Sequence, residues 1–290
     1  MIEIFSQIDT VYLDVCRNLL HAPKVGNTRE INNVKIMIDD VENANTIVSV
    51  RDISATYLFA ELLWYFEGRN DTKFIGQFAS MWNDISDDGK TANSAYGYII
   101  KSKYYFDQAE KVIELLRKDP RSRRAKINLN TPNKGVIETK DEPCTMSLHY
   151  LIRDGKLHAT AVMRSNDIWF GFPYDVAFFT ELQRYIAKEL GIPCGSYTHF
   201  VVSMHLYDRD YGKVKEIVEN PTSIPIVFDR EKFHKDRRFI SELLNIAMRH
   251  DIDCKELLMN LLHDHDIYTE NTCESCFGAA NNDCKRCPHS

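Results

Sequence analysis

A cysteine, an arginine and an aspartate on neighbouring stretches give this chain its clearest chemical signal. Cys144 follows Pro143, Arg164 comes twenty residues later, and Asp175 ends the run that begins at Gly171. A cysteine is a useful nucleophile only as the thiolate, and a nearby guanidinium group favours that form through its opposite charge. We therefore interpret Cys144 as a nucleophile that Arg164 activates. The alternative for a lone cysteine is a small buried hydrophobic residue.

A second candidate is an acidic residue within an apolar helix. The residues from Ser54 to Tyr65 have helical spacing, with Ser54 as the N-cap, and Gly68 lies just beyond the end. Glu61 is the only charged residue in this run. A buried carboxylate is costly unless it is paired, hydrogen-bonded or functional, and burial raises its pKa toward a range suited to proton transfer. We therefore consider a functional role for Glu61 beside a structural one. The alternative is a buried acid held by one arginine.

Three arginines crowd the end of a predicted helix. That helix ends at Asp119 and Pro120, and Arg121, Arg123 and Arg124 follow directly. Guanidinium groups this close repel one another unless an anion lies among them. The chemical interpretation is an anion site, and the alternative is a solvated charge run.

The elements that position these residues follow from the spacing of the apolar side chains. Alternation on both sides of Asp154-Gly155 predicts a β-hairpin. Further strands are predicted near residues 34–38 and 200–207. Helices are predicted near residues 5–19, 54–65, 107–118, 177–190, 238–249 and 254–263, with Gly191 ending the fourth.

Composition limits the class of protein. The chain has 290 residues, 44% of them hydrophobic, enough for one large domain with a small appendage. The net charge of −6 argues against general nucleic-acid binding, which needs a basic face. No run of about 18 apolar residues occurs, and the residues after Met1 do not resemble a signal peptide. We expect no membrane association and a soluble protein of the cytoplasm, or of the host cytoplasm if the source is viral.

The last cysteines have the spacing of a metal site. Two C-x-x-C pairs are separated by seven residues and comprise Cys273, Cys276, Cys284 and Cys287. Four thiolates presented in this way suit a structural zinc ion with no open position for catalysis. The alternatives are two disulfides or a redox-active dithiol. We expect a catalytic domain over residues 1–268 and a cysteine-rich zinc-binding tail over residues 269–290.

Several motifs recur together in a fixed order between about residues 25 and 210. They are Glu61–Trp64, Trp82, Tyr96–Gly97, Ser122–Arg124, Pro143–Cys144, Arg164–Asp167, Gly171–Asp175 and His205–Tyr207. In order and spacing they resemble the thymidylate synthase and deoxycytidylate hydroxymethylase family. The resemblance implies a mixed α/β fold on a large twisted sheet flanked by helices. It also implies a homodimer packed sheet against sheet, and one-carbon transfer from 5,10-methylenetetrahydrofolate to a pyrimidine nucleoside monophosphate.

The resemblance also implies roles for individual residues. The Cys144 thiolate adds to carbon 6 of the base and leaves electron density at carbon 5. Glu61 organises water and proton transfer. The phosphate is held by Arg29, Arg164 and Ser165, with Arg123 and Arg124 contributed across the dimer interface, while His205 and Tyr207 bind the sugar hydroxyl and Asn166 lies within the substrate motif. On the folate side the matching residues are Arg51, Trp82, Asp167 and Gly171.

Asp175 stands where thymidylate synthases have asparagine. An amide both donates to a uracil carbonyl and accepts from the ring N–H, whereas a carboxylate only accepts, which suits the amino group of cytosine. The departure predicts a cytidylate substrate. The alternative is that Asp175 only caps a helix beginning near Val176.

The final step of the reaction stays open at this point. Water at the one-carbon unit gives a hydroxymethyl group and hydride gives a methyl group. Thr145 replaces the histidine that follows the nucleophile in the synthases, so the order of water there is not that of a synthase. We expect a (deoxy)cytidylate 5-hydroxymethyltransferase, with a methyltransferase or thymidylate synthase as the alternative. An inactive scaffold that binds nucleic acid or protein through its zinc tail is the alternative of another class.

Overall fold

The computed structural model describes residues 6–101, 106–130, 139–224, 226–250 and 252–270. The chain divides into two units. Unit 1 holds residues 1–48 and 53–221, and unit 2 holds residues 49–52 and 222–290. Within the described ranges, no helix combines the length and the apolar character that a membrane span requires.

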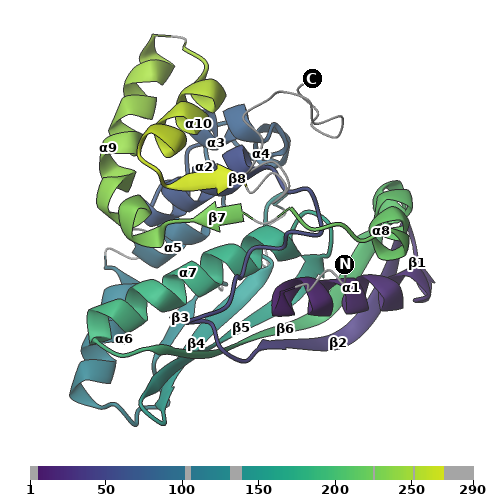
Figure 1. Ribbon diagram of the computed structural model, residues 1–290, viewed down its shortest axis with the longest axis horizontal. Helices are drawn as coiled ribbons and strands as arrows, with labels where there is room; N and C mark the ends of the chain where they lie inside the picture. Colours follow the sequence, from purple (N-terminus) through teal and green to yellow (C-terminus); the bar gives the residue numbers. More distant parts are fainter. Residues whose placement is uncertain (1–5, 102–105, 131–138, 225, 251, 271–290) are drawn as a thin grey trace, which may run out of the picture. The chain divides into compact units, whose positions relative to one another are not determined.

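Unit 1 is built on a six-stranded mixed sheet with strand order β1-β2-β6-β5-β4-β3 (Figure 1). Neighbouring strands are antiparallel except β5 and β6, which run parallel because α7 crosses between them. The strands are β1 (Lys24–Val25), β2 (Thr28–Ile38), β3 (Lys126–Asn128), β4 (Thr145–Arg153), β5 (Lys156–Asp167) and β6 (Cys194–Tyr207).

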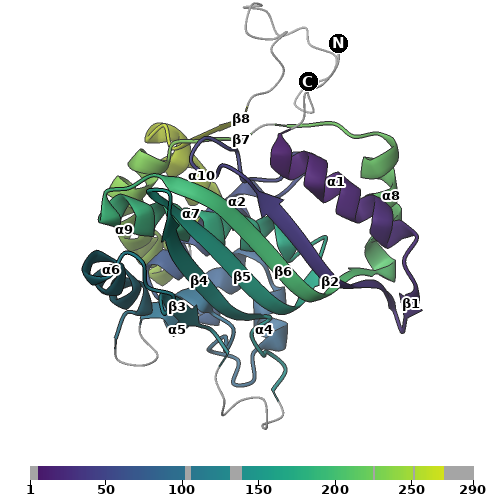
Figure 2. The ribbon, with the colours of Figure 1, turned by 90° about the horizontal axis from the view of Figure 1, so that it is seen from below.

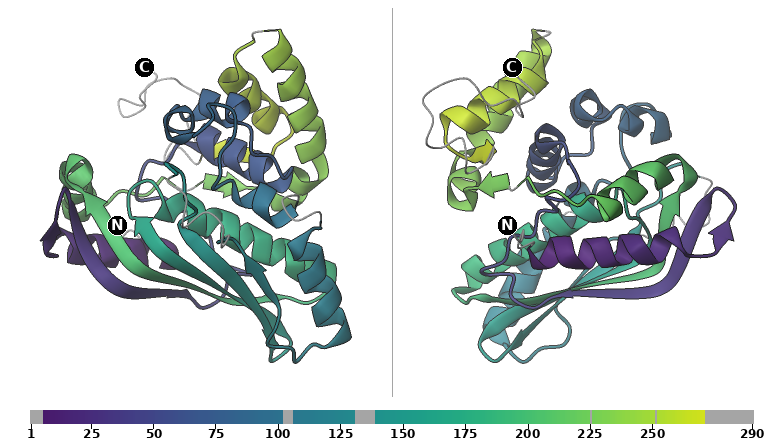
Figure 3. Two further views of the ribbon diagram at one scale, coloured as in Figure 1. Left: turned by 180° about the vertical axis from the view of Figure 1, so that it is seen from behind. Right: turned by 45° about the vertical axis from the view of Figure 1, so that its right-hand side comes forward.

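Helices of unit 1 cover one face of this sheet, with α1 and α7 lying directly on it (Figure 3). The helices of the unit are α1 (Gln7–Leu20), α2 (Ala55–Phe66), α3 (Thr72–Phe78), α4 (Met81–Ile85), α5 (Tyr96–Lys101), α6 (Gln108–Lys118), α7 (Phe172–Leu190), the 3-10 turn η1 (Asp208–Asp210) and α8 (Tyr211–Glu219). Figure 2 looks onto the other face, where the strands are in front. On that side Met37 of β2 is 45% exposed and Val202 of β6 is 44% exposed.

Unit 2 is small. The strands β7 (Ile226–Phe228) and β8 (Tyr268–Glu270) pair antiparallel, and α9 (Arg230–Arg249) packs with α10 (Cys254–Asp264). The predicted start of α9 near residue 238 is wrong by eight residues, because Asp229 caps the helix and accepts a hydrogen bond from the Lys232 amide.

Most elements predicted from sequence are confirmed. Ser54 caps α2 by accepting from the Tyr57 amide, and Gly68 follows the helix with φ of +66°. The hairpin between β4 and β5 turns at Asp154 and Gly155, both with positive φ. The mixed α/β fold on a large sheet flanked by helices is therefore confirmed.

Helix α7 corrects one prediction that bears on function. It begins at Phe172, five residues before the predicted start, with Gly171 at the N-cap and Pro173 in the first turn. Asp175 thus lies inside the helix, and its amide donates to the Gly171 carbonyl. The alternative that Asp175 is the N-cap is wrong, so its side chain is available for another role.

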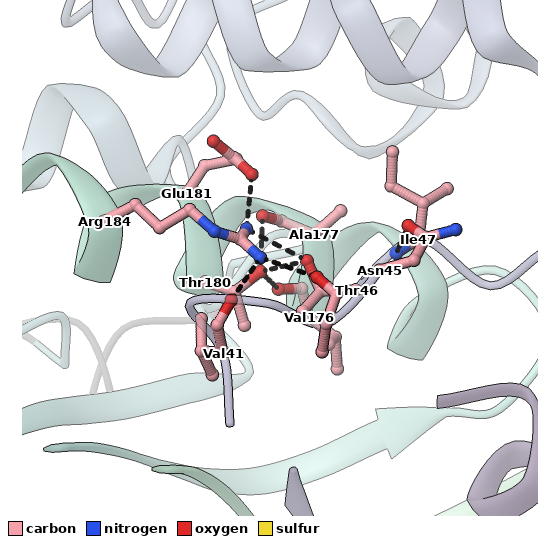
Figure 4. Close-up of polar contacts among 10 residues, drawn as sticks. Val41, Asn45, Thr46, Ile47, Val176, Ala177, Thr180, Glu181 and Arg184 are labelled. Carbon is pink, nitrogen blue, oxygen red and sulfur yellow. Dashed lines mark hydrogen bonds and ion pairs between the residues drawn. The ribbon is translucent and has the colours of Figure 1, made fainter. Parts of the chain in front are cut away.

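Arg184, whose side chain is 13% exposed, fixes α7 to the loop that follows β2 (Figure 4). Arg184 donates from Nη1 to Glu181 Oε1 and Thr46 Oγ1, and from Nη2 to the carbonyl oxygens of Val41 and Ala44. Charge-assisted bonds of this kind are stronger than neutral ones, and here they hold the helix in one position. The position of Asp175, nine residues earlier on α7, depends on that anchoring.

In both central strands, β5 and β6, the alternation of buried and exposed side chains shifts by one residue near the same place. In β5 the buried positions are odd-numbered up to Met163 and even-numbered from Asn166, and β6 changes likewise after Val201. Met163 pairs with Val201 and Ser165 with Ser203, so the register is kept across Arg164 and Val202 while the side-chain alternation shifts. As a result Asn166 faces the helices, while Ser165 and His205 share the opposite orientation.

The approach of α5 to α2 requires glycine at position 97. A Cβ atom there would collide with the carbonyl oxygen of Tyr65, which is backbone and has no freedom to move aside. Gly97→Ala should therefore lower the free energy of unfolding by about 1–3 kcal/mol, as overpacking does. Urea denaturation measures this.

Gly212 in α8 is the matched control, because a Cβ atom at that position would meet no other atom within 4 Å. Gly212→Ala should be neutral or stabilising by up to about 1 kcal/mol. Equal destabilisation by both substitutions would contradict the close packing of α5 on α2.

Candidate active site

Cys144 lies in the loop directly before β4, and Arg164 fixes that loop. The Arg164 backbone N–H donates to the Cys144 carbonyl at 2.9 Å. Its guanidinium donates from Nε to the Pro143 carbonyl at 3.2 Å and from Nη2 to the Glu142 carbonyl at 2.9 Å. The two residues that sequence analysis linked are therefore adjacent, and Arg164 positions the nucleophile as well as acting on its charge.

The charge balance at the thiol differs from the expectation. Burial raises the pKa of Cys144 to about 11, the Arg164 guanidinium lowers it, and the carboxyl groups of Asp175, Asp141 and Glu142 raise it further. Arg164 acts in the expected direction, but burial outweighs it. The resting form at neutral pH is the thiol, so the thiolate needs further positive charge or a proton acceptor near Cys144.

Glu61 is buried against aromatic side chains. Its Oε1 accepts hydrogen bonds from the hydroxyl groups of Tyr57, at 2.7 Å, and Tyr65, at 3.3 Å. Trp82 of α4 donates from its indole nitrogen to the Tyr57 hydroxyl at 3.0 Å. Burial raises the pKa of Glu61 to about 7, although both tyrosines lower it. An acid that titrates near neutrality suits proton transfer. The alternative of a partner arginine is not met, because its hydrogen-bond donors in the described chain are tyrosines.

Asp175 is a second buried acid in the same region. Asn166 donates from Nδ2 to Asp175 Oδ2 at 2.7 Å. Burial and then the charge of Glu61 raise the pKa of Asp175 to about 8, while hydrogen bonds from Asn166 and Tyr96 lower it. Tyr96 also interacts electrostatically with Cys144 and Glu61. The titratable groups of Cys144, Asp175 and Glu61 therefore all lie within electrostatic range of Tyr96, and Asp175 lies within range of Cys144 and Glu61.

Polar side chains lie together where β5 and β6 end. Ser165 Oγ and His205 Nδ1 are 3.3 Å apart, and the rings of His205 and Tyr207 meet edge to face. Asp167 Oδ1 accepts from the Trp169 amide, and burial raises the pKa of Asp167. Asp167 Oδ2 makes no hydrogen bond with a described residue, so an acceptor is left for a ligand donor. Arg209 lies over the Tyr207 ring at 4.2 Å.

Arg29 of β2 pairs with Leu206 of β6, between His205 and Tyr207. Arg29 donates to the Ala22 carbonyl and lies over the Tyr211 ring, and its buried Nε has no hydrogen-bond partner in the described chain. Arg123 and Arg124 are exposed, and their guanidinium groups pair with no described residue. Arg51 is buried and belongs to unit 2. The tail cysteines, Cys273, Cys276, Cys284 and Cys287, lie outside the described residues, so the zinc site stays a prediction.

Gly171, which the resemblance placed on the folate side, packs against Asn166. A Cβ atom at position 171 would lie 2.5 Å from Asn166 Nδ2, the nitrogen that bonds Asp175. Sequence analysis did not single out His199 and Tyr197, which connect to the other side of Asn166. The available signal was their alternation on β6, which is typical of core residues.

Comparison with known proteins gives the family. The thymidylate synthase family model matches residues 10–268, most of the chain. The chain belongs to the thymidylate synthase family. Its chemistry is folate-dependent one-carbon transfer to a pyrimidine nucleotide, with methylenetetrahydrofolate as the one-carbon donor.

Two of the similar proteins are deoxyuridylate hydroxymethyltransferases by name, and a third is a thymidylate synthase. The chain is 28% identical to a deoxyuridylate hydroxymethyltransferase of Bacillus phage SP01, over 92% of this chain and 82% of that protein. It is 30% identical to a deoxyuridylate hydroxymethyltransferase of Pseudomonas phage M6, over 58% of this chain and 49% of that protein. It is 27% identical to a thymidylate synthase of Clostridium beijerinckii, over 72% of this chain and 81% of that protein.

The role of Arg164 can be measured from the reactivity of the thiol. Replacing Arg164 with Met removes the cation beside Cys144 and should slow its alkylation by iodoacetamide at pH 8 by roughly tenfold, as one pKa unit corresponds to a tenfold change in thiolate. Mass spectrometry of the Cys144 peptide gives the rate. Arg153→Met, at the exposed end of β4, is the control and should leave the rate unchanged. An unchanged or faster rate in Arg164→Met would show that Arg164 does not favour the thiolate.

The two buried acids make stability depend on pH. Their pKa values are raised on folding, to about 7 for Glu61 and about 8 for Asp175, so the folded protein holds protons that the unfolded chain releases. This stabilisation is complete below the unfolded pKa values and is lost as pH rises through 7 and 8. The free energy of unfolding should fall by about 3 kcal/mol between pH 6.5 and pH 9, of which Asp175 contributes about 2 kcal/mol.

Asp175→Asn should make that decline clearly shallower, because the amide does not titrate. Chemical denaturation at several pH values measures both proteins. Parallel curves for the two proteins would mean that Asp175 ionises normally in the folded state.

Proposed function

We propose that this member of the thymidylate synthase family is a (deoxy)cytidylate 5-hydroxymethyltransferase. The observation that carries the proposal is Asp175, a buried carboxyl group that receives a hydrogen bond from Asn166 in the region of the nucleophile. A group held as an acceptor suits the amino group of cytosine, which donates, better than the carbonyl of uracil, which accepts.

The chemistry uses the chain's own residues as follows. Cys144, once deprotonated, adds through sulfur to carbon 6 of the base, and the electron pair of the C5–C6 double bond becomes available at carbon 5. Methylenetetrahydrofolate supplies the one-carbon unit that carbon 5 receives. Glu61, with a pKa of about 7, exchanges protons at neutral pH. Loss of the C5 proton and departure of tetrahydrofolate leave an exocyclic methylene group, water adds to it to give the hydroxymethyl group, and the Cys144 sulfur leaves carbon 6.

Asp175 binds the two bases differently in its two protonation states. The neutral acid both donates and accepts, so it pairs with cytosine at N3 and N4 or with uracil at O4 and N3. The carboxylate still accepts from the cytosine amino group but offers no donor to uracil O4. Cytosine is therefore accepted in both states and uracil in one.

A uridylate substrate is the second candidate. The two phage relatives are named deoxyuridylate hydroxymethyltransferases, and the pKa of about 8 means that Asp175 is largely neutral at pH 7. In that state a uracil base has both of its partners. The two candidates share the hydroxymethyl product and differ in the base.

The proposed enzyme is a homodimer that packs through the sheet face opposite α1 and α7. In support, that face carries exposed apolar side chains such as Met37 and Val202, and exposed Arg123 and Arg124 have no partner in the described part of their own chain. Arginines contributed by the partner would add positive charge for a substrate phosphate. They would also lower the pKa of Cys144 if they reach the thiol.

Product analysis tests the proposal. Incubation of dCMP, CMP and dUMP in parallel with methylenetetrahydrofolate should convert a cytidylate to a product heavier by CH2O, detected by mass spectrometry. Cys144→Ser should abolish conversion of every nucleotide. A product heavier by CH2 would make the enzyme a methyltransferase, and conversion of dUMP alone would favour the uridylate candidate. If no nucleotide is converted, the proposed enzymatic activity is contradicted.

The pH dependence of base choice tests Asp175 itself. The ratio of kcat/KM for dCMP to that for dUMP should rise between pH 7 and pH 9, as Asp175 ionises and uracil loses its donor. Asp175→Asn should lower the ratio by tenfold or more, about the effect of one buried hydrogen bond lost by cytosine, and should remove the rise with pH. A ratio that is constant with pH in the unaltered enzyme would exclude Asp175 as the residue that discriminates.

A further inference from the structure

A chain of buried hydrogen bonds leads from the sheet to Asp175. The Tyr197 hydroxyl lies 2.8 Å from His199 Nδ1, and His199 Nε2 lies 2.9 Å from Asn166 Oδ1. Asn166 Nδ2 in turn donates to Asp175 Oδ2 at 2.7 Å. The exposed fractions of Tyr197, His199 and Asn166 are 1%, 0% and 3%, so water does not compete for these bonds. We call these four residues the Tyr197–Asp175 chain.

The donor and the acceptor of every bond follow from the bond that Asn166 donates to Asp175 and from the neutral state of His199. Asn166 has one donor nitrogen, used on Asp175, and so its oxygen must accept from His199 Nε2. Burial lowers the pKa of His199 to about 3, so the ring is neutral and carries one N–H. That proton is on Nε2, which leaves Nδ1 to accept from the Tyr197 hydroxyl. All donors then point toward Asp175.

The surroundings give the amide of Asn166 little freedom. Gly171 lies against Nδ2, since even a methyl group at that position would come within 2.5 Å of it. Phe172 packs its ring edge to face with His199, with centroids 5.1 Å apart and planes at 86°. Both residues begin α7, the helix that carries Asp175. The same turn of helix therefore positions the carboxyl group and the groups that donate toward it.

We propose that Tyr197 and His199 are positioning residues that hold the Asn166 amide with its N–H toward Asp175, and so keep Asp175 as the acceptor that a cytosine amino group requires. This inference rests on the proposed function, because it concerns base recognition by Asp175. Neither Tyr197 nor His199 needs to touch the nucleotide.

Loss of the histidine donor would have the opposite effect. The Asn166 amide would no longer be held with its N–H toward Asp175, and Asp175 would lose the hydrogen bond that favours its charged form, so its pKa would rise. A neutral Asp175 whose proton is not used on Asn166 can donate to uracil O4. If His199 Nε2 then accepted from Asn166, the histidine proton would move to Nδ1. The chain therefore favours cytosine only in the direction that Tyr197 and His199 impose.

Nuclear magnetic resonance of the full-length protein with 15N-labelled histidine tests the direction without any activity. His199 should be the neutral Nε2–H tautomer and should not titrate between pH 5 and pH 8. Tyr197→Phe should allow the Nδ1–H tautomer to appear. An Nδ1–H tautomer in the unaltered protein, or titration of His199 near pH 6.5, would overturn the proposal.

Base selectivity provides the functional readout. His199→Phe keeps a flat ring but removes the donor, and it should shift the kcat/KM ratio of dCMP to dUMP toward dUMP by about tenfold. Tyr197→Phe should shift the ratio in the same direction by a smaller factor. His199→Gln retains an amide donor and should recover part of the selectivity. His158→Phe is the control, since His158 on β5 bonds Ser196 and is no member of the Tyr197–Asp175 chain, and the ratio should not change.

The outcomes separate the two proposals. Failure of the unaltered enzyme to convert any nucleotide contradicts the proposed function, and the tautomer experiment still decides the direction of the chain. Conversion with a ratio that is the same in the unaltered enzyme, His199→Phe and Tyr197→Phe overturns the positioning role alone. A uniform loss of activity on both nucleotides in all three variants of the chain, with no change in ratio, also overturns it, because it would mark a structural role.

Discussion

The structure depends on the burial of two carboxyl groups beside a half-buried thiol. Glu61 and Asp175 lie on α2 and α7, raise each other's energy when both are charged, and together with Cys144 form a region where ionisation is costly. At neutral pH this favours the neutral form of Asp175 and of Cys144 and leaves Glu61 near its midpoint. Each group changes its charge only when a neighbour or a bound molecule compensates, and the chemistry of the family needs such changes.

The surrounding framework exists to hold these groups in place. Arg164 fixes the nucleophile loop through three hydrogen bonds, Arg184 anchors α7, and Gly97 and Gly171 permit approaches that no larger residue allows. The shift in side-chain alternation near Arg164 turns Asn166 toward the helices, where it meets Asp175. Positioning by packed and hydrogen-bonded neighbours is what an enzyme needs to act on one base and not another.

The sequence predicted the fold, and the proximity of Cys144 to Arg164, where strong local rules or family motifs applied. Ser54, Gly68 and Gly191 end or begin helices through cap chemistry, and Cys144 was found from its motif. It did not predict that burial outweighs Arg164 at the thiol, because desolvation depends on long-range packing. It also missed His199 and Tyr197, since alternating residues on a buried strand read as core, and their bonds to Asn166 join separate elements.

The protonation of Asp175 is the most direct measure of this account. The carboxyl carbon of Asp175, followed by 13C nuclear magnetic resonance in selectively labelled protein, should titrate with a pKa of about 8 in the free enzyme. Saturating cytidylate should lower that pKa, because the cytosine amino group donates to the charged form, whereas uridylate should raise it or leave it unchanged. A pKa near 4 in the free enzyme that neither nucleotide alters would contradict the account.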